Sequence, residues 1–328
     1  MAADGMERSK QSRLSVEQPG RDSSVSEMGE EILVAFGVDA NYAPHLAVTI
    51  TSIVSNAPGA KFRFLIINDG FPIEERRGVE SCAPGQTFQW EEVSDTDLLS
   101  QPGYIHVSRA GLFRLMIPQF APQTASRAIY LDVDLVVLGD IRELANADMG
   151  ASAIGAVFDP DMDADLFADE NGLPRIRLGY FNSGVLLLDL KKIREEHTFR
   201  DALDIILAGK ALLRYGDQCA LNIVFWGRWA RLDPVWNVQR RMAMRKDWEP
   251  AYATAEELQR HRRPRLIHYT TAEKPWRGGT YHPYTWSYYK YLRKTPYWSA
   301  VSRKAGRSFI QHLRDFVRAN LLLTTLRR

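Results

Sequence analysis

The 328-residue sequence lacks the features that mark several protein classes. It has two cysteines, Cys82 and Cys219, which are too few and too far apart for a zinc cluster or a disulfide framework. No apolar run approaches the roughly 18–20 residues that span a bilayer, and no apolar signal segment is visible at the N-terminus. The net charge is only +2, which gives no reason to expect nucleic acid as a partner. We therefore expect a cytoplasmic protein with reduced thiols.

Residues 1–28 contain almost no large apolar side chains and are rich in Ser, Glu, Gly, Gln and Arg. Such a segment cannot bury enough surface to offset its ordering entropy, so it predicts a disordered tail. The chain as a whole is 45% hydrophobic and 25% charged, which is typical of a globular protein.

Beyond the tail, short apolar runs alternate with helical patterns. The runs that predict strands cover residues 31–37, 62–67, 87–91, 127–140, 152–158, 185–190 and 265–268. Helices are predicted over residues 44–56, 73–81, 109–117, 191–207 and 219–225. This order favours an α/β fold with a mainly parallel, Rossmann-like central sheet flanked by helices. The acidic stretch 159–175, with little periodicity, predicts a surface insertion or lid.

Residues 127–140 read RAIYLDVDLVVLGD and form the central motif. In an extended strand, Asp132 and Asp134 point to the same side, with Val133 between them. Two carboxylates at that spacing repel each other unless a cation or a proton lies between them. The alternative is a sheet-edge turn with solvated acids. Apolar sequence on both sides instead favours a divalent-metal site at the carboxyl end of a central strand.

The first strand is not followed by the G-x-G-x-x-G pattern of dinucleotide-binding folds. It is followed by Asp39, Asn41 and Tyr42, a carboxylate, an amide and an aromatic ring. These types suit a ribose hydroxyl and a nucleobase. The alternative is that Asn41 caps the next helix and Asp39 belongs to a turn.

Further polar residues lie near predicted strand and helix ends. Arg114 is either a surface residue with a buried stem or a cation directed at an anionic ligand. Asp217 is either a helix N-cap or a contact at a pocket floor. His268 leaves a strand as Asp134 does, and together with the two acids it would make a mixed oxygen and nitrogen site. Such a site favours Mn²⁺ over Mg²⁺.

The C-terminal segment from Trp298 is amphipathic. Its apolar residues recur at helical spacing: Trp298, Val301, Ala305, Phe309, Leu313, Phe316, Val317 and Leu321. The other face carries Arg303, Lys304, Arg307, Arg314 and Arg318. Two interpretations stay open: a helix packed on its own domain, or an interfacial helix on anionic lipid at the inner face of a membrane.

With these motifs in place, the chain resembles glycosyltransferase family 8. The resemblance extends from Ile32 to Trp276 and depends on six motifs in order: VAFGVDANYAPHL, the FRL around Arg114, YLDVDLVVLGDI, YFNSGVLLLDL, YGDQCALN and IHYTTAEKPW. It implies a single GT-A-type α/β domain over residues 29–283, followed by a basic, aromatic helical segment over residues 284–328.

The resemblance also implies roles for individual residues. Uracil and ribose contacts are implied for Asp39, Asn41 and Tyr42. Manganese ligands are implied at Asp132, Asp134 and His268. Donor sugar and diphosphate contacts are implied for Arg114, Val133, Thr270, Thr271 and Lys274. Sugar-facing positions are implied for Asn182, Asp217 and Gln218. Thr271 stands where the family usually has glycine, and its added bulk could narrow the diphosphate site.

The activity implied is metal-dependent, retaining transfer of a hexose, galactose or glucose, from a UDP-sugar to a glycan or glycolipid, such as a lipopolysaccharide core. The cofactor would be Mn²⁺ or Mg²⁺. Because a neutral amide at Gln218 is a poor nucleophile, we favour attack by the acceptor hydroxyl on the same face as the leaving phosphate.

Two rival functions remain. A phosphatase of the haloacid dehalogenase type also uses D-x-D-x-[TV], with Asp132 as nucleophile and Asp134 as acid/base. Against it, the motif lies mid-chain and the downstream acidic pair is absent. The second rival is a non-catalytic sugar-nucleotide binder, against which the intact acids and His268 argue.

Overall fold

The computed structural model describes residues 31–93, 109–209, 213–244, 254, 256–257 and 263–326. The predicted disordered tail, residues 1–28, lies outside these residues. Glu31–Arg328 forms one compact unit.

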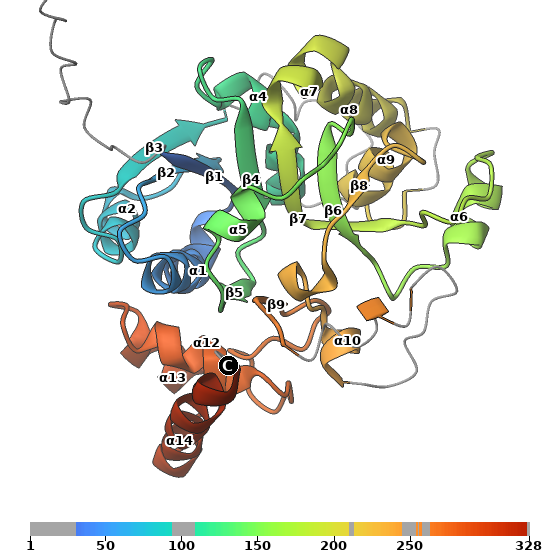
Figure 1. Cartoon of the computed structure of the whole chain (residues 1–328). Helices are drawn as coiled ribbons and strands as arrows, with labels where there is room; N and C mark the ends of the chain where they lie inside the picture. Colours follow the sequence, from blue (N-terminus) through green and yellow to red (C-terminus); the bar gives the residue numbers. More distant parts are fainter. Residues whose placement is uncertain are drawn as a thin grey trace, which may run out of the picture. The chain divides into compact units, whose positions relative to one another are not determined.

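A seven-stranded sheet lies at the centre of this unit (Figure 1). Its strands are β1 (Ile32–Gly37), β2 (Phe62–Asn68), β3 (Thr87–Glu92), β4 (Arg127–Leu131), β6 (Ile154–Phe158), β7 (Phe181–Asp189) and β8 (Ala230–Arg231), in the order β3-β2-β1-β4-β7-β6-β8. Neighbours are parallel except β7, which runs antiparallel to β4 and β6. The predicted mainly parallel sheet is confirmed.

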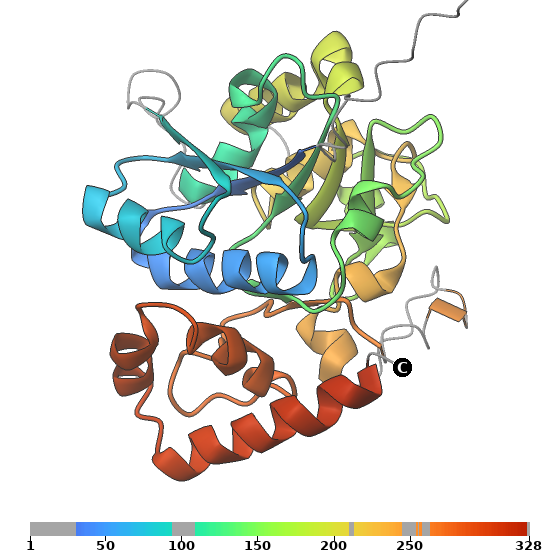
Figure 2. The same ribbon diagram turned by 60° about the vertical axis from the view of Figure 1, so that its left-hand side comes forward.

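Helices cover this sheet. They include α1 (Ala43–Asn56), α2 (Ile73–Glu80), α5 (Arg142–Ala145) and α9 (Asp217–Val224), whereas α10 (Arg240–Met244) lies below the sheet in Figure 1. Short 3-10 turns occur at η1 (Ala40–Tyr42) and η3 (Pro234–Trp236). In Figure 2, α1 lies between the sheet and the C-terminal helices. The carboxyl ends of β1 and β4 meet at one edge, where open α/β sheets hold their ligands.

The prediction of one continuous strand over residues 127–140 is wrong. Strand β4 ends at Leu131, the chain bends at Val133 and Asp134, and β5 (Leu135–Val137) pairs with β9 (Leu266–His268) in a separate two-stranded sheet. The Thr49 hydroxyl on α1 donates to the carbonyls of Val133 and Leu135, at 3.2 and 2.9 Å. These bonds fix the bend, so the bend and not strand alternation places the two acids.

Three predicted segments also differ in detail. Residues 191–207 form two helices, α7 (Leu190–Glu196) and α8 (Thr198–Ala208), because His197 between them has a left-handed φ of 55°. The predicted insertion contains a helix, α6 (Ala164–Glu170). The helix expected around Arg114 is three short turns: α3 (Arg109–Phe113), η2 (Arg114–Met116) and α4 (Ile117–Phe120).

The C-terminal segment forms α12 (Thr285–Leu292), α13 (Trp298–Lys304) and α14 (Phe309–Leu326). Helix α12 buries its tyrosines and contacts α1. The apolar stripe predicted along the whole segment divides: Val301 and Ala305 are buried, whereas five residues of the stripe are exposed, namely Phe309, Leu313, Phe316, Val317 and Leu321. Among the described residues, no helix is both long enough and apolar enough to cross a membrane.

Candidate active site

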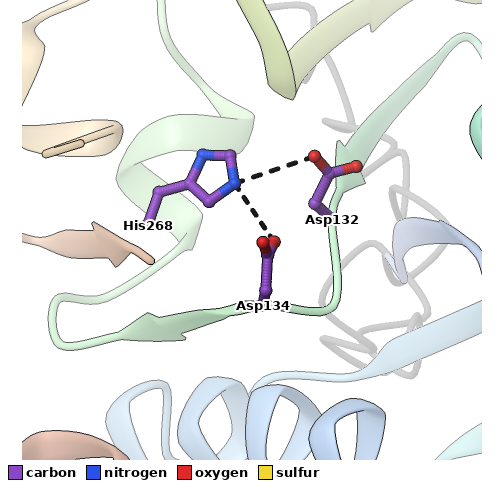
Figure 3. Close-up of side chains that lie close together, drawn as sticks. All are labelled: Asp132, Asp134 and His268. Carbon is purple, nitrogen blue, oxygen red and sulfur yellow. Dashed lines mark hydrogen bonds and ion pairs between the residues drawn. The ribbon is translucent and has the colours of Figure 1, made fainter. Parts of the chain in front are cut away.

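Asp132, Asp134 and His268 converge at the end of β4 (Figure 3). One possible ligand atom from each lies within 4.8 Å of the others. His268 Nε2 is 3.1 Å from Asp134 Oδ1 and 3.7 Å from Asp132 Oδ2. The bend after β4 supplies both acids, and β9, paired with β5, supplies the imidazole. The three predicted metal ligands are therefore brought together.

The two ring nitrogens of His268 face different partners, and Nε2 is the one that lies 3.1 Å from Asp134 Oδ1. Its Nδ1 lies 3.0 Å from Asn237 Oδ1, while Asn237 Nδ2 donates to Asn182 Oδ1 at 2.9 Å. The amide oxygen of Asn237 therefore faces the imidazole, and Nδ1 carries the proton that it donates. Nε2 is therefore the nitrogen directed at the acids, and a neutral ring protonated on Nδ1 would offer its lone pair there to a metal, as in most metal-binding histidines. Two carboxylates and one imidazole fit a divalent cation such as Mn²⁺.

Gly184 on β7 packs directly against His268 and Asp132. A Cβ atom at this position would lie 2.2 Å from His268 Cε1 and 2.6 Å from Asp132 Oδ2. The Gly184 carbonyl accepts a 2.8 Å hydrogen bond from the Asp132 amide. Only glycine allows the strand to approach the imidazole and the carboxylate this closely.

Lys274 lies against the same centre. Its Nζ is 2.5 Å from Asp134 Oδ2 and also donates to the Tyr269 carbonyl. Burial alone would raise the pKa of Asp134, but Lys274 and His268 hold that pKa well below its ordinary value. Asp134 is consequently ionised, and its negative charge attracts a cation beside it.

Arg114 connects Asp132, one of the candidate metal ligands, to Asp217 on α9. It is 7% exposed, and its guanidinium lies 3.0 Å from Asp132 Oδ1 and 2.8 Å from Asp217 Oδ2. It also donates to the Ser183 carbonyl at 2.8 Å and stacks over the Tyr130 ring. Burial would lower the pKa of Arg114, yet the two carboxylates raise it, so the cation is retained. The interpretation of Arg114 as a surface residue is wrong.

Asp217 is the first residue of α9, and the N-cap is Gly216. The N-cap interpretation of Asp217 is therefore wrong. Its buried carboxylate lines a cleft, and burial, partly opposed by Arg114, raises its pKa to about 6.

The neighbouring Gln218 is held by hydrogen bonds on both sides of its amide. Its Oε1 accepts from the Ser183 amide at 3.0 Å and from Asn182 Nδ2 at 3.2 Å, and its Nε2 donates to Asp159 Oδ2 at 3.1 Å. Asn182 donates to the same Asp159 oxygen. The two predicted sugar-facing amides are thus parts of one network that Asp159 closes.

The cleft extends from Asp132 and Asp134 to the end of β1. The predicted residues that line it are Asp39, Tyr42, Arg114, Asp132, Val133, Asp134 and Asp217. Asp39 Oδ1 accepts from the Asn41 amide at 2.8 Å, so Asp39 and not Asn41 is the cap of this turn. Asn41 is exposed and does not belong to the lining.

Thr270 and Thr271 lie in the loop after β9. Thr270 Oγ1 accepts a hydrogen bond from the Arg240 amide at 3.1 Å. Thr271 is exposed and has a left-handed φ of 73°, and its hydroxyl donates to Glu273. Neither residue lines the cleft, nor do Asn182, Gln218, His268 and Lys274.

The sequence interpretation missed Asp159, Asn237 and Gly184 as parts of this site. Asp159 follows the buried strand β6 directly, as Asp132 follows β4, and this position was the available signal. Nothing in the sequence near Asn237 indicates its contact with His268. Gly184 lies in the YFNSGVLLLDL motif, but its role depends on side chains distant in the chain.

Comparison with known proteins identifies the family. The sequence profile of Glycosyl transferase family 8 matches residues 33–279. The chain belongs to this family. It is 30% identical over 292 residues to a lipopolysaccharide 1,2-glucosyltransferase of Escherichia coli, covering 85% of this chain and 82% of that protein. It is 24% identical to a lipopolysaccharide 1,3-galactosyltransferase of Salmonella typhimurium, covering 81% of this chain and 79% of that protein.

Among solved structures, the galactosyltransferase LgtC in complex with donor and acceptor sugar analogues has a similar fold. The TM-score is 0.70 at 22% identity, covering 83% of this chain and 100% of that chain. The predicted GT-A-type fold is confirmed, and this family 8 protein is a glycosyltransferase. The phosphatase and non-catalytic interpretations are therefore wrong.

Proposed function

We propose that this family 8 glycosyltransferase is a retaining, metal-dependent enzyme that moves galactose or glucose from a UDP-sugar to a glycan or glycolipid acceptor. The observation that carries the proposal is the convergence of Asp132, Asp134 and His268 beside the cleft that Asp39 and Tyr42 also line. Since the relatives named above act on lipopolysaccharide, we propose its core, or another cell-surface glycan, as acceptor.

The donor would lie along the cleft with its nucleoside at the β1 end. There Asp39 offers a carboxylate for ribose hydroxyls and Tyr42 a ring for uracil, with Asn41 at the rim. The diphosphate would reach the metal ligands, Lys274 and the loop at Thr270 and Thr271. The hexose would then face the network of Asn182, Asp217 and Gln218.

A divalent cation held by the three ligands would act as a Lewis acid on the diphosphate and stabilise the charge that grows there. Lys274, already within reach of Asp134, would stabilise the same charge. Arg114 keeps Asp132 and Asp217 in position by pairing with both.

We propose same-face attack by the acceptor. The Gln218 amide is neutral and engaged by hydrogen bonds at both ends, which makes it a poor nucleophile. The acceptor oxygen forms the new bond to the anomeric carbon as the bond to phosphate breaks, and the leaving phosphate oxygen takes the acceptor proton. A covalent sugar adduct on Gln218 or Asp217, trapped and identified by mass spectrometry, would contradict this mechanism.

A thermal-shift screen tests the donor and the metal together. UDP-galactose, UDP-glucose and ADP-glucose are added with Mn²⁺, with Mg²⁺ or with chelator, and UDP release is measured for each. We expect a raised melting temperature and slow hydrolysis with a UDP-hexose and metal only, and neither effect in Asp134→Asn. Equal stabilisation by UDP-sugars in chelator would contradict metal-dependent donor binding.

We also propose that α14 contacts anionic membrane lipid. Its His312 and Asp315 face the body of the protein, while Leu313, Val317 and Leu321 are 51%, 46% and 65% exposed. Arg314 and Arg318 are exposed one residue after Leu313 and Val317, about 100° further around the helix. An apolar face flanked by basic side chains suits the boundary between headgroups and acyl chains.

A further inference from the structure

His45 is a buried residue of α1 that the proposed mechanism does not use. It is 7% exposed and lies in the first turns of α1, three residues after Tyr42. Its ring contacts side chains from three separate segments: Tyr42, Trp276 and Tyr288. Because these partners are far apart in the sequence, the buried His45 side chain links α1 to the loop after β9 and to α12.

The first contact faces the nucleoside end of the cleft. The ring centroids of His45 and Tyr42 are 5.4 Å apart, at an interplanar angle of 69°. Tyr42 itself lines the cleft. This edge-to-face arrangement restrains the ring that we propose to contact uracil.

The second contact faces the lysine loop. The His45 ring stacks on Trp276, with centroids 3.7 Å apart and planes at 22°. Trp276 follows Lys274 by two residues. Between them, the Pro275 carbonyl accepts a hydrogen bond from Tyr289 of α12 at 3.2 Å. The loop that carries Lys274 is therefore held between α1 and α12.

The third contact is a buried hydrogen bond to α12. His45 Nδ1 lies 2.7 Å from the Tyr288 hydroxyl, and the Tyr288 ring also packs against Trp276 with centroids 5.1 Å apart. Burial lowers the pKa of His45 to about 3, with a smaller opposing effect of Asp134 and smaller lowering effects of Lys274 and Lys304. The imidazole is therefore neutral near pH 7, and it stacks as a neutral ring.

We infer that the His45–Tyr288 hydrogen bond positions the residues that bind the donor. It fixes the position of Tyr42 relative to the loop that carries Lys274, and His45 is the positioning residue. The inference rests on the proposed function, because it assumes that Tyr42 and Lys274 contact the nucleotide. It makes α12 a structural support of the donor site, in contrast to α14.

Two conservative variants test it, with one matched control. His45→Phe keeps a ring on Trp276 and removes the hydrogen-bonding nitrogen, and Tyr288→Phe removes the hydroxyl. The control is Tyr291→Phe, also on α12, whose buried hydroxyl accepts a 2.7 Å hydrogen bond from Asn56 at the far end of α1. Each variant removes a hydrogen bond between the same two helices, and Tyr291→Phe also removes the 3.3 Å bond from Lys290 to the Tyr291 hydroxyl, so all three are expected to lower the melting temperature.

The readout is the Kd of UDP in the presence of Mn²⁺, measured by isothermal titration calorimetry. We expect His45→Phe and Tyr288→Phe each to raise this Kd roughly tenfold, the scale of one hydrogen bond, and the double variant to raise it no further. Tyr291→Phe is expected to leave the Kd of UDP within about twofold of the wild-type value.

The UDP binding measurements distinguish failure of this inference from failure of the proposed function. If the wild-type protein binds UDP and Tyr288→Phe weakens binding no more than Tyr291→Phe, the inference is overturned and the proposed function stands. If the wild-type protein binds no UDP with Mn²⁺, the proposed function fails and the inference fails with it.

Discussion

At the residue scale, Gly184 shows most directly how the backbone shapes the candidate metal centre. Alanine at this position would bring a methyl group within 2.2 Å of the His268 ring and 2.6 Å of Asp132. Its φ is not in the left-handed region, so the steric contact alone decides the outcome. We predict that Gly184→Ala lowers Mn²⁺ affinity at least tenfold in a calorimetric titration, because the imidazole must move away from the acids.

A control separates this effect from general packing damage. Gly155 on β6 also lies in the sheet, and the nearest atoms to a Cβ there belong to the Leu232 and Met149 side chains, at 3.1 Å or more. Gly155→Ala is expected to cost some stability and to leave Mn²⁺ affinity unchanged. Equal metal affinity in the two variants would show that Gly184 has no special place in the centre.

Asp217 gives a prediction about pH. Its carboxyl has a pKa raised by burial from 3.8 to about 6 in the native state. Between these values the native protein binds more protons than the unfolded chain, so the free energy of unfolding falls as pH rises from about 4 to about 6. In Asp217→Asn this contribution is absent.

The test is denaturant unfolding of both proteins in chelator across this pH range. Relative to the wild type, Asp217→Asn is expected to gain on the order of 2–3 kcal/mol of stability between pH 4 and pH 6. Stability curves that stay parallel would show that the native pKa of Asp217 is ordinary.

At the element scale, the loop after β9 contains a strained residue. Thr271 has a φ of 73°, a conformation that costs a β-branched residue about 1 kcal/mol or more. The hydrogen bond from the Thr271 hydroxyl to Glu273 is exposed to solvent and offsets little of this conformational cost. Glycine adopts the conformation freely.

We predict that Thr271→Gly is more stable than Thr271→Ala by about 1 kcal/mol in denaturant unfolding. This order is the reverse of that expected in a helix, where alanine is favoured over glycine by a similar amount. Ala208→Gly at the end of α8 serves as the helical comparison. If the alanine variant at Thr271 is the more stable one, the loop is not strained in solution.

Elements with strong local signals were predictable from sequence. The apolar runs of β1, β2 and β7, and the periodic pattern of α1, each had one consistent interpretation, and their order favoured the mainly parallel sheet. The residues at which a predicted strand or helix is interrupted were not predictable from the sequence. Val133 begins a bend because Thr49 on α1 binds its carbonyl, and His197 interrupts a helical pattern through a local left-handed turn.

The site was predictable where residue type carries the chemistry. Asp132, Asp134 and His268 have side chains that suggest a metal on their own. The structure was needed for Asn237 and Gly184, because an amide that orients an imidazole and a glycine that makes room for it acquire their roles only through long-range contacts. His45 belongs to the same class, as its partners lie 231 and 243 residues further along the sequence.

At the scale of the whole molecule, α12 and α14 have different surroundings although both lie in the C-terminal segment. Helix α12 is packed on α1, whereas α14 presents exposed apolar side chains. Arg307, expected on the basic face, pairs with buried Asp315 and lies over the Tyr289 ring. The exposed charge that remains for lipid comes from residues such as Arg314 and Arg318.

The proposed contact of α14 with lipid gives a prediction. We predict that combined Leu313→Gln, Val317→Gln and Leu321→Gln substitutions lower co-sedimentation with phosphatidylglycerol vesicles several-fold and leave UDP-sugar hydrolysis unchanged. Ile73→Gln, an exposed apolar residue on α2, is the matched control. Deletion of residues 297–328 is expected to act similarly, but it also removes the Tyr297 bond to Glu75, so the substitutions are the cleaner test. Unchanged partitioning of the triple variant would exclude α14 as the lipid contact.

The central claim is that one cation is held jointly by Asp132, Asp134 and His268. Pulsed electron paramagnetic resonance of the protein loaded with Mn²⁺ tests it most directly, because a coordinated imidazole nitrogen couples to the metal electron spins. We predict one bound Mn²⁺ with a nitrogen coupling that disappears in His268→Ala. Bound Mn²⁺ without nitrogen coupling in the wild-type protein, or with a coupling that persists in His268→Ala, would contradict the account.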